Sequence, residues 1–544
     1  MLAAALGIAW GGCDRDAAPT TSPEPTATRA RGLDDTAARM LAHVPARTPY
    51  VWAGVEPPSE RQLRQLRPLL DASLAAIAEQ LDAATATAPE AAALLAVLRG
   101  HMDRAGLVAL GLRSNPHWVV YGIGLAPVVR IELGDPARVQ ASIDAIDRAD
   151  GHSAHRTIAG HPTWTWGSGE LELAVAIDGE TLVLAAYPSR VRESMLAHVA
   201  GAAAPADSLA RSRWYEQARG EHDLLGAAIG MVDLERALAL ARGEGTPLER
   251  AITAAWFDDD LARDDCAAGV LTTLHDAPRL WFGPRAIDGA RLEAVTIWEL
   301  SPRVEDELRG IVAPLPGLER GALHDALAAV ALGIDSDATL ALVQRWLDAP
   351  ALRACGLAPE QTAAPPWLRG LRGASLVVDA WHPERNTGDG ALALGVIDPL
   401  RWLADALPSI DRSALAHVGR PVRLLALDPT LGDPTLREGW AARGRDRLAV
   451  ALGQGARHRV RRAVSHAQRN RGHLAVASID VHGWTELYPR ERLRALVAAS
   501  DPSERALTDA IVWAIDHVEA SLLVVDGGLE LRGVTTLRPR FTRR

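Results

Sequence analysis

Three closely spaced histidines are the residues of this chain whose type and spacing most directly suggest chemistry. His152, His155 and His161 lie within residues 151–161, a segment that contains neither a cysteine nor a carboxylate. Neutral imidazoles at this spacing can bind Zn²⁺ or Cu²⁺. The segment also leads into a predicted hairpin, where polar residues are expected on the solvent side. We keep these histidines as weak metal-ligand candidates and predict no metal site.

Two clusters of charged residues are the next candidates. Carboxylates precede Cys266 at Asp258, Asp259, Asp260, Asp264 and Asp265. A calcium loop needs alternating ligands and a turn glycine, so a helix N-terminus is the favoured interpretation of this run. A basic run from Arg457 to His473 could contact anionic lipid headgroups or acids linked to peptidoglycan. It has no interleaved aromatic residues, which argues against nucleic acid, and a solvated helix face is favoured.

The sequence contains no known catalytic motif. It lacks a Gly-x-Ser-x-Gly elbow, a His-Glu-x-x-His pair, a P-loop and a Gly-x-Gly-x-x-Gly loop. A triad is assembled in space, so a hydrolase without a sequence signature remains an alternative. We predict no catalytic residue and no cofactor. Trp164 and Trp166 alternate along a predicted strand and form either a binding shelf or part of the core, where large aromatic residues more often lie.

Cys13 follows the short apolar run 6–12 and looks like the acylated cysteine of a bacterial lipoprotein signal. This resemblance implies a protein outside the cytoplasm, anchored by its lipid to the inner or the outer membrane. Residues 1–12 are then the signal. Residues 13–35 are rich in Pro and Thr and form a disordered tether, because they cannot bury enough apolar surface to fold. The alternative is an ordinary cysteine in a disordered N-terminus, since no basic residue precedes the apolar run.

The remaining two cysteines, Cys266 and Cys355, are predicted to form one disulfide. An oxidising compartment favours such a bridge, and it leaves no free thiol in the folded part. The alternative is two buried, reduced cysteines, which are common in protein cores. Neither residue belongs to a Cys-x-x-Cys motif, so a zinc site is not predicted.

Composition places the chain among ordinary globular proteins. Hydrophobic residues make up 48% and charged residues 23% of its 544 residues. The net charge of −10 argues against nucleic acid as a partner of the whole chain. All the basic residues other than histidine are arginines, which we attribute to the base composition of the gene rather than to phosphate binding.

Turn chemistry predicts an α+β fold of antiparallel hairpins and strand–helix units. Alternating apolar runs meet at Asp178-Gly179, Asp288-Gly289, Asp526-Gly527 and the looser turn 386–390. Other strands end in an aspartate that precedes a helical pattern, as at Asp135 and Asp398, where proline follows. We expect the helices to pack on one face of curved sheets.

The pattern also suggests an internal duplication. Two parts of the chain share one predicted order of elements. The first consists of residues 182–185, a helix, residues 225–229 and Asp233, and the second of residues 448–451, a helix, residues 474–479 and Asp480. We divide the folded part into a first α+β domain, 36–255, and a second, 256–544, with a possible sub-boundary at 360–370.

Several segments resemble an uncharacterised family of bacterial extracytoplasmic lipoproteins, a domain of unknown function. They are residues 41–51, residues 208–212 ahead of Trp214 and Tyr215, and the spacing of Cys266 and Cys355. The resemblance implies the fold repetition and the location, and it implies no activity.

We therefore expect a lipid-anchored extracytoplasmic protein with a structural or interaction role and no recognisable active site. One alternative is a periplasmic carrier that binds lipid or another hydrophobic ligand in a sheet-lined groove. A second alternative is an unrecognised hydrolase. The membrane is the partner of the N-terminal lipid, and the protein or lipid partner of the folded part is unknown.

Overall fold

A computed structural model describes most of the chain after residue 32. The described residues are 33–64, 103–151, 153–167, 169–256, 265–288, 290–318, 322–348, 365–385, 387–408, 410–424, 439–465, 472–499 and 512–538, together with short pieces within 66–101 and residues 353, 467, 468, 470, 505 and 508. Cys13, His152, Cys355, residues 258–260 and residue 264 lie outside them, as do the predicted signal and almost all of the tether.

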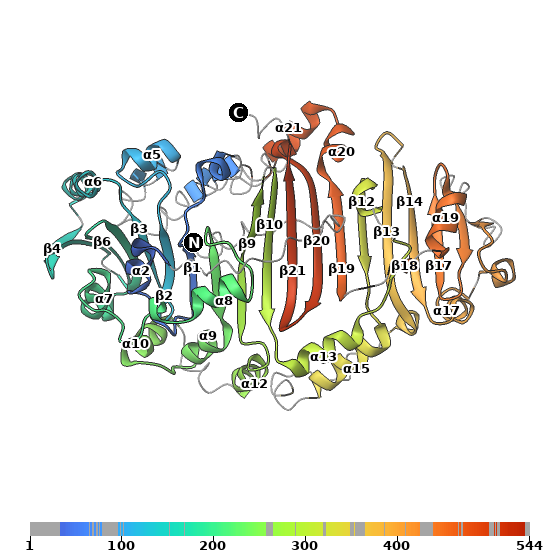
Figure 1. The fold of residues 1–544 in the computed structure, drawn as a ribbon, viewed down its shortest axis with the longest axis horizontal. Helices are drawn as coiled ribbons and strands as arrows, with labels where there is room; N and C mark the ends of the chain where they lie inside the picture. The colour runs from blue at the N-terminus through green and yellow to red at the C-terminus, as the bar shows by residue number, and fades with distance from the viewer. Residues whose placement is uncertain are drawn as a thin grey trace, which may run out of the picture.

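One antiparallel sheet of 19 strands runs through both predicted domains (Figure 1). The pairings join the strands in the spatial order β4 (Ala154–Ile158), β5 (His161–Trp166), β6 (Leu171–Asp178), β7 (Thr181–Pro188), β3 (Ala126–Glu132), β2 (Trp118–Ile123), β1 (Tyr50–Gly54), β8 (Ile229–Asp233), β9 (Arg279–Asp288), β10 (Arg291–Glu299), β21 (Gly528–Leu537), β20 (Ile515–Val525), β19 (His473–Asp480), β12 (Ala328–Leu332), β13 (Leu371–His382), β14 (Thr387–Val396), β17 (Arg447–Leu452), β16 (Trp440–Arg443) and β15 (Val422–Arg423). The short strands β11 (Leu315–Pro316) and β18 (Ala467–Gln468) form a separate pair.

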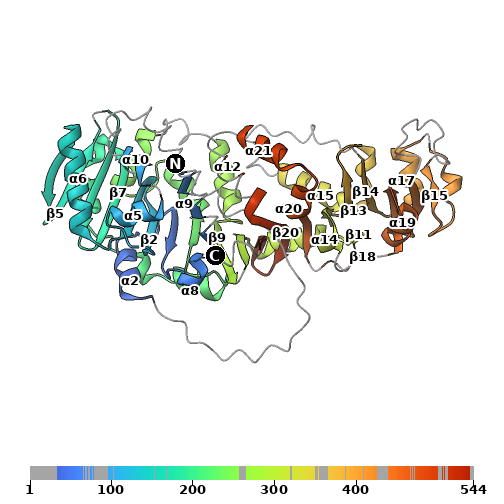
Figure 2. The same cartoon turned by 90° about the horizontal axis from the view of Figure 1, so that it is seen from above.

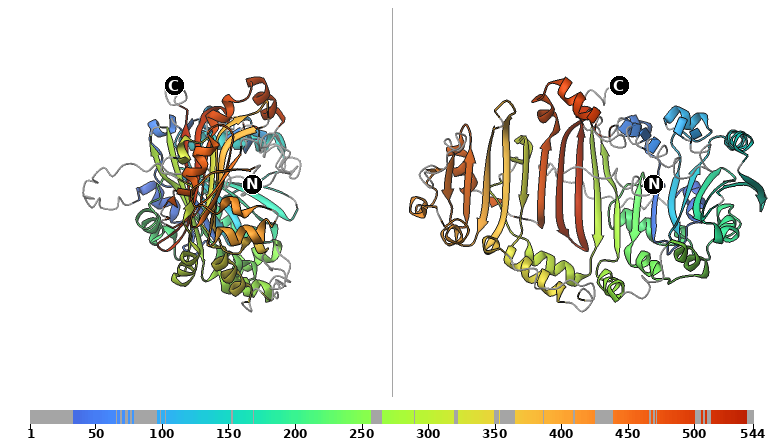
Figure 3. Two further views of the ribbon diagram at one scale, coloured as in Figure 1. Left: turned by 90° about the vertical axis from the view of Figure 1, so that its right-hand side faces the viewer. Right: turned by 180° about the vertical axis from the view of Figure 1, so that it is seen from behind.

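The helices flank this sheet, as the view from above shows (Figure 2). They are α2 (Asp35–Leu41), α5 (Arg104–Ala109), α6 (Pro136–Asp150), α7 (Arg192–Val199), α8 (Trp214–Gly220), α9 (Leu234–Ala241), α10 (Pro247–Trp256), α12 (Asp265–Leu274), α13 (Pro302–Ile311), α14 (Ala322–Asp325), α15 (Ser336–Leu347), α17 (Pro399–Ala406), α19 (Ala456–Ser465), α20 (Val481–Glu486) and α21 (Arg490–Ala499). Helices α13 and α15 run together past the ends of the central strands in both face-on views (Figures 1 and 3). None of the helices in the described part is both long and apolar enough to span a bilayer.

The local units predicted from turn chemistry are present. The four hairpins are β6–β7, β9–β10, β13–β14 and β20–β21. The third turn lies earlier than predicted, because residues 387–390 belong to β14 and pair with β13. Asp135 and Asp398 cap α6 and α17 by accepting backbone N–H groups of the first helical turn, and a proline follows each of them. The α+β content is therefore as expected, because these turn and cap residues act locally, whatever the distant parts of the chain do.

The strand order repeats along the chain. The order β3-β2-β1-β8-β9-β10 of the first half corresponds to β14-β13-β12-β19-β20-β21 of the second half. Asp233 and Asp480 cap the helices that follow β8 and β19. Counting across the paired registers from these two residues aligns Asp135 with Asp398, which are also helix caps. The same count aligns residues 182–185 with 448–451, the segments that the sequence pattern had paired.

The two halves meet at the β10–β21 pair. Its register runs from Arg291 opposite Thr536 to Glu299 opposite Gly528. Each half contributes its last strand, so an approximate two-fold relation holds between them. The first repeat therefore extends to β10, beyond the predicted domain boundary at 255, and the division into two domains stays a prediction.

The expectation that helices pack on one face is wrong for the first half. On β7, Val183 belongs to a core that includes Met195 and Leu196 of α7. Its neighbour Leu182 belongs to a different core, with Val139 of α6. Adjacent strand residues point to opposite faces, so helices cover both sides here. The cause is that both faces of these strands carry large apolar side chains, and each needs a cover.

Candidate functional site

The structure separates two of the histidines proposed as metal ligands. On β4, His155 is paired with Trp164 and its ring stacks on the indole at a centroid distance of 4.9 Å. His161 lies three residues before Trp164 on β5, and therefore points to the other face of the sheet. Within the described residues no group of at least three His, Cys, Asp or Glu side chains is arranged to hold a metal. His155 and His161 thus do not form one site.

Trp164 and Trp166 form part of the core. Their exposed fractions are 0% and 1%, and they pack with Val139 and Ile143 of α6. The core interpretation of these residues is confirmed, and the binding-shelf interpretation is wrong, because α6 covers this face.

A buried ion cluster that the sequence did not reveal lies on the other face of β3 and β6. Arg130 is 1% exposed, and its Nη1 donates to Asp178 Oδ2 at 3.1 Å. Its Nε donates to the Tyr121 hydroxyl at 3.3 Å and its Nη2 to the His198 carbonyl at 3.2 Å. His43 Nε2 and His161 Nε2 each lie 3.8 Å from a carboxylate oxygen of Asp178. The strands and α7 thus surround one ion pair with polar groups that hold its geometry.

The histidine of this cluster at position 43 makes native stability depend on pH. Burial, together with the nearby charge of Arg130, lowers the pKa of His43 from 6.5 to about 4. The unfolded chain then binds more protons than the native state between these values. Stability is therefore full above about pH 6.5 and falls as the pH drops towards 4, by up to about 3 kcal/mol. We expect His43→Leu to flatten this part of the curve in urea unfolding measured from pH 4 to 7. An unchanged pH dependence in that variant would contradict the assignment.

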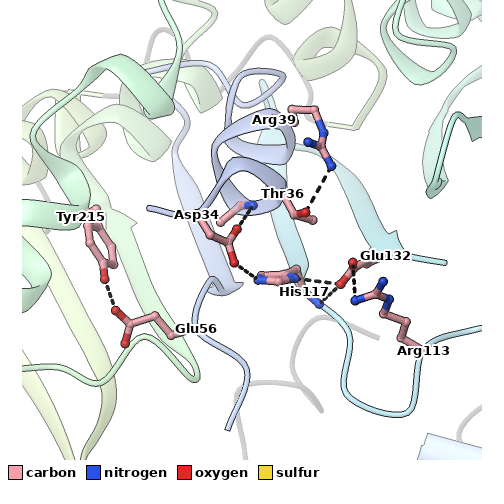
Figure 4. Close-up of polar contacts among 9 residues, drawn as sticks. Asp34, Thr36, Arg39, Glu56, Arg113, His117, Glu132 and Tyr215 are labelled. Carbon is pink, nitrogen blue, oxygen red and sulfur yellow. Dashed lines mark hydrogen bonds and ion pairs between the residues drawn. The ribbon is translucent and has the colours of Figure 1, made fainter. Parts of the chain in front are cut away.

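A second polar cluster lies at the start of the described part of the chain (Figure 4). His117 Nδ1 lies 2.8 Å from Glu132 Oε2, and its Nε2 lies 2.8 Å from Asp34 Oδ2. Arg113 also reaches Glu132, at 3.1 Å. Partial burial acts to raise the pKa of Asp34, but bonds from the Ala37 amide and His117 outweigh it and lower the pKa.

This arrangement serves structure better than catalysis. Both ring nitrogens of His117 are occupied by carboxylates, so neither is free to take a proton from a substrate. Asp34 also caps α2. The cluster therefore ties α2, and with it the end of the predicted tether, to β2 and β3. Nearby, the Tyr215 hydroxyl on α8 donates to Glu56 after β1, a contact that Figure 4 also draws.

A polar cavity of about 490 Å³ lies beside the seam between the halves. His222, Arg285 and Glu299 are among its lining residues. The Arg285 guanidinium makes two bonds to the Glu530 carboxylate, at 3.0 and 2.9 Å. Glu299 accepts from Trp281 Nε1 at 2.7 Å. These charged groups already have partners in the protein, so they explain how β9, β10 and β21 hold together.

Some arginines of the basic run contact other side chains, and others line a cavity that opens to solvent. On α19, Arg459 pairs with Asp379, and Arg457 lies over the Trp440 ring at 5.3 Å. Arg461 and Arg462 line a second cavity, of about 650 Å³. The helix interpretation of this run is right for Ala456–Ser465, whereas residues 467–468 belong to β18.

Exposed apolar side chains gather on one face of β12, β13, β14 and β19. Val330 pairs with Leu376, and Leu376 with Leu392, so the three share a face. Leu332 and Ile479 lie on the same face, because Leu332 is two residues from Val330 and Ile479 pairs with Ala328. We call these five residues the apolar strip. Their exposed fractions are 38–44%.

The strip differs from the equivalent part of the first half. Counting across the registers aligns Val330 with Trp52. Trp52 is half-buried, and its ring meets that of Trp118 edge to face at 4.7 Å. Sequence reasoning missed the strip because alternation predicts two faces but does not say which face stays open.

The predicted cysteine bridge stays a prediction. Cys266 lies half-buried on α12, whereas Cys355 lies outside the described residues. Asp265 is the first residue of α12, and the other four carboxylates of that run lie outside the described residues. Comparison with protein-family models, with curated proteins and with solved structures finds no match to this chain.

Proposed function

We propose that this protein is a lipid-anchored extracytoplasmic interaction protein that binds a helix of a partner protein on the apolar strip. The observation that carries the proposal is the strip itself. Large apolar side chains at the surface are ordinary when they are scattered, but a contiguous group marks an interaction site. Val330, Leu376 and Leu392 are contiguous across three neighbouring strands, which lie side by side in Figure 1.

The shape of the strip favours a protein over a small lipid. A small ligand needs a concave site that buries most of its surface, and the strip lies on the open face of a sheet. Addition of a strand is also disfavoured, because β12 and β13 are hydrogen-bonded to neighbours along both edges. A helix with apolar residues at helical spacing fits such a face, as α6 does within this protein through Val139, Ile143 and Ile146.

The alternatives have less support in the described part of the chain. A carrier would use an apolar groove, but Asp, Glu or Arg side chains contribute to the lining of both cavities described above. A hydrolase would need a base within reach of a nucleophile, and His117, which lies between two carboxylates, has both ring nitrogens engaged. Anchoring through Cys13 and an extracytoplasmic location are parts of the proposal that come from the sequence.

A photo-crosslinking amino acid at position 376 tests the proposal in intact cells. We expect a discrete protein adduct, because Leu376 is 44% exposed within the strip. The matched control is position 171, because Leu171 is 51% exposed at the start of β6, away from the strip. Adding Val330→Asp should weaken the adduct about tenfold or more through lost apolar burial and a desolvated charge. A lipid adduct, or equal adducts at both positions, would contradict the proposal.

A further inference from the structure

The cavity beside α19 collects positive charge from two directions. His458, Arg461, Arg462 and Ser465 line it from one side of the helix, at the spacing that places residues on one face. Arg445 and Arg447, from the turn that joins β16 to β17, line it from the opposite side. The cavity measures about 650 Å³ and opens to solvent, so a small ion or a headgroup can enter it.

Among the described residues, the acidic side chains at the cavity do not balance the charges of Arg445, Arg447 and Arg461. Asp446 is the one carboxylate among the described lining residues, and it lies 3.2 Å from Arg447 Nε. Within the described residues, Arg445 and Arg461 have no carboxylate within ion-pair distance. The protein as a whole carries a net charge of −10, so this local excess is not part of a generally basic surface.

The equivalent position in the first half holds an internal carboxylate. Both turns have the same length: Ile177 pairs with Leu182, and Arg443 with Leu448. The registers therefore align Asp178 with Gly444 and Thr181 with Arg447. In the first half, Asp178 is the anion that Arg130 and the surrounding histidines contact. In the second half that carboxylate is replaced by a glycine, while the turn gains two arginines.

The geometry points to a binding site for a phosphate group in this cavity, which takes the place that an aspartate fills in the first half. Guanidinium groups recognise phosphate oxygens through paired N–H donors, and they approach here from two elements. The phosphate could belong to a free anion or to a lipid headgroup at the membrane surface. Both sources offer anionic phosphate oxygens to Arg445 and Arg461.

Stabilisation of the helix end accounts for only part of the cluster. Arg447 Nη1 donates to the Val464 carbonyl at 3.4 Å, and cations are favourable at a helix C-terminus. Arg445 makes no such bond to α19 in the described part of the chain, yet it lines the same cavity. If capping of α19 by Arg447 were the whole role of the cluster, removal of Arg445 would leave anion affinity unchanged.

The test uses the full-length protein and two probes. Inorganic phosphate is titrated calorimetrically, and cosedimentation is measured with phosphatidylcholine vesicles that do or do not contain phosphatidic acid. We expect saturable binding in at least one arm, weakened at least tenfold by Arg445→Gln combined with Arg461→Gln. The matched control is Arg401→Gln, an exposed arginine on α17 that does not line the cavity. Circular dichroism melts should show that both variants remain folded.

The two arms separate the sources of the phosphate. Binding of free phosphate that the variant loses, without a gain from phosphatidic acid, identifies a soluble anion. Vesicle binding that depends on phosphatidic acid and on both arginines identifies a headgroup. Absence of binding in both arms, or equal binding by the variant and the parent protein, would overturn the inference.

Discussion

Replacing Arg130 by methionine is expected to lower the free energy of unfolding by about 3–5 kcal/mol, the cost of leaving one partner of a buried ion pair alone. Methionine fills much of the volume without the charge, so the loss measures electrostatics more than a cavity. Among the described residues, His43 and His161 would remain as the ionisable neighbours of the Asp178 carboxylate, each at 3.8 Å. Urea unfolding at pH 7, followed by circular dichroism, provides the measurement.

Two controls make this prediction specific. The double variant Arg130→Met, Asp178→Asn removes both charges, so it should be more stable than the single variant. The charge of Arg130 also helps to hold the pKa of His43 low. That pKa should therefore rise in Arg130→Met, as read from the histidine ring protons by NMR. A double variant no more stable than the single one, with an unmoved pKa, would show that the loss is a packing effect.

Replacing Glu530 by glutamine is expected to destabilise the seam between the halves by about 3 kcal/mol, because it leaves the Arg285 guanidinium without its charged partner. The side chains of Arg285 and Glu530 are 17% and 7% exposed, so water compensates little. Glu530 also lies 3.9 Å from Arg532, which itself bonds to Glu293 at 2.9 Å. Thermal unfolding should show a clearly lowered midpoint.

The control for the seam is an exposed ion pair. Arg213 and Glu216 are 74% and 65% exposed, so Glu216→Gln should change the midpoint little. Equal shifts in the two variants would contradict the view that burial gives the seam its strength.

The fold could be predicted from the sequence where the determinants are local. Asp135 before Pro136 specifies a helix start, and Asp178 before Gly179 specifies a tight turn, and both depend only on neighbouring backbone groups. The merging of both halves into one sheet could not be predicted in this way. It depends on the pairing of β10 with β21, strands more than 200 residues apart by number, which no local pattern encodes.

The candidate sites were less predictable than the fold. Arg130 lies on a strand beside two valines, and a charged residue in such a strand is expected to be exposed to solvent. It is buried because Asp178, from the distant β6–β7 hairpin, forms an ion pair with it. His155 and His161 are close in sequence, yet His161 is offset by three positions from Trp164, the partner of His155, and this odd offset places the two histidines on opposite faces. The equivalence of Asp178 and Gly444 can be recognised only when the strand registers of both halves are known.

Mass spectrometry of the native protein extracted from cell membranes tests the central claim most directly. The account predicts a mature chain that begins at an acylated Cys13, together with a peptide that links Cys266 to Cys355. Recovery of the chain from the soluble cytosolic fraction, with Met1 retained and all cysteines reduced and unmodified, would contradict it.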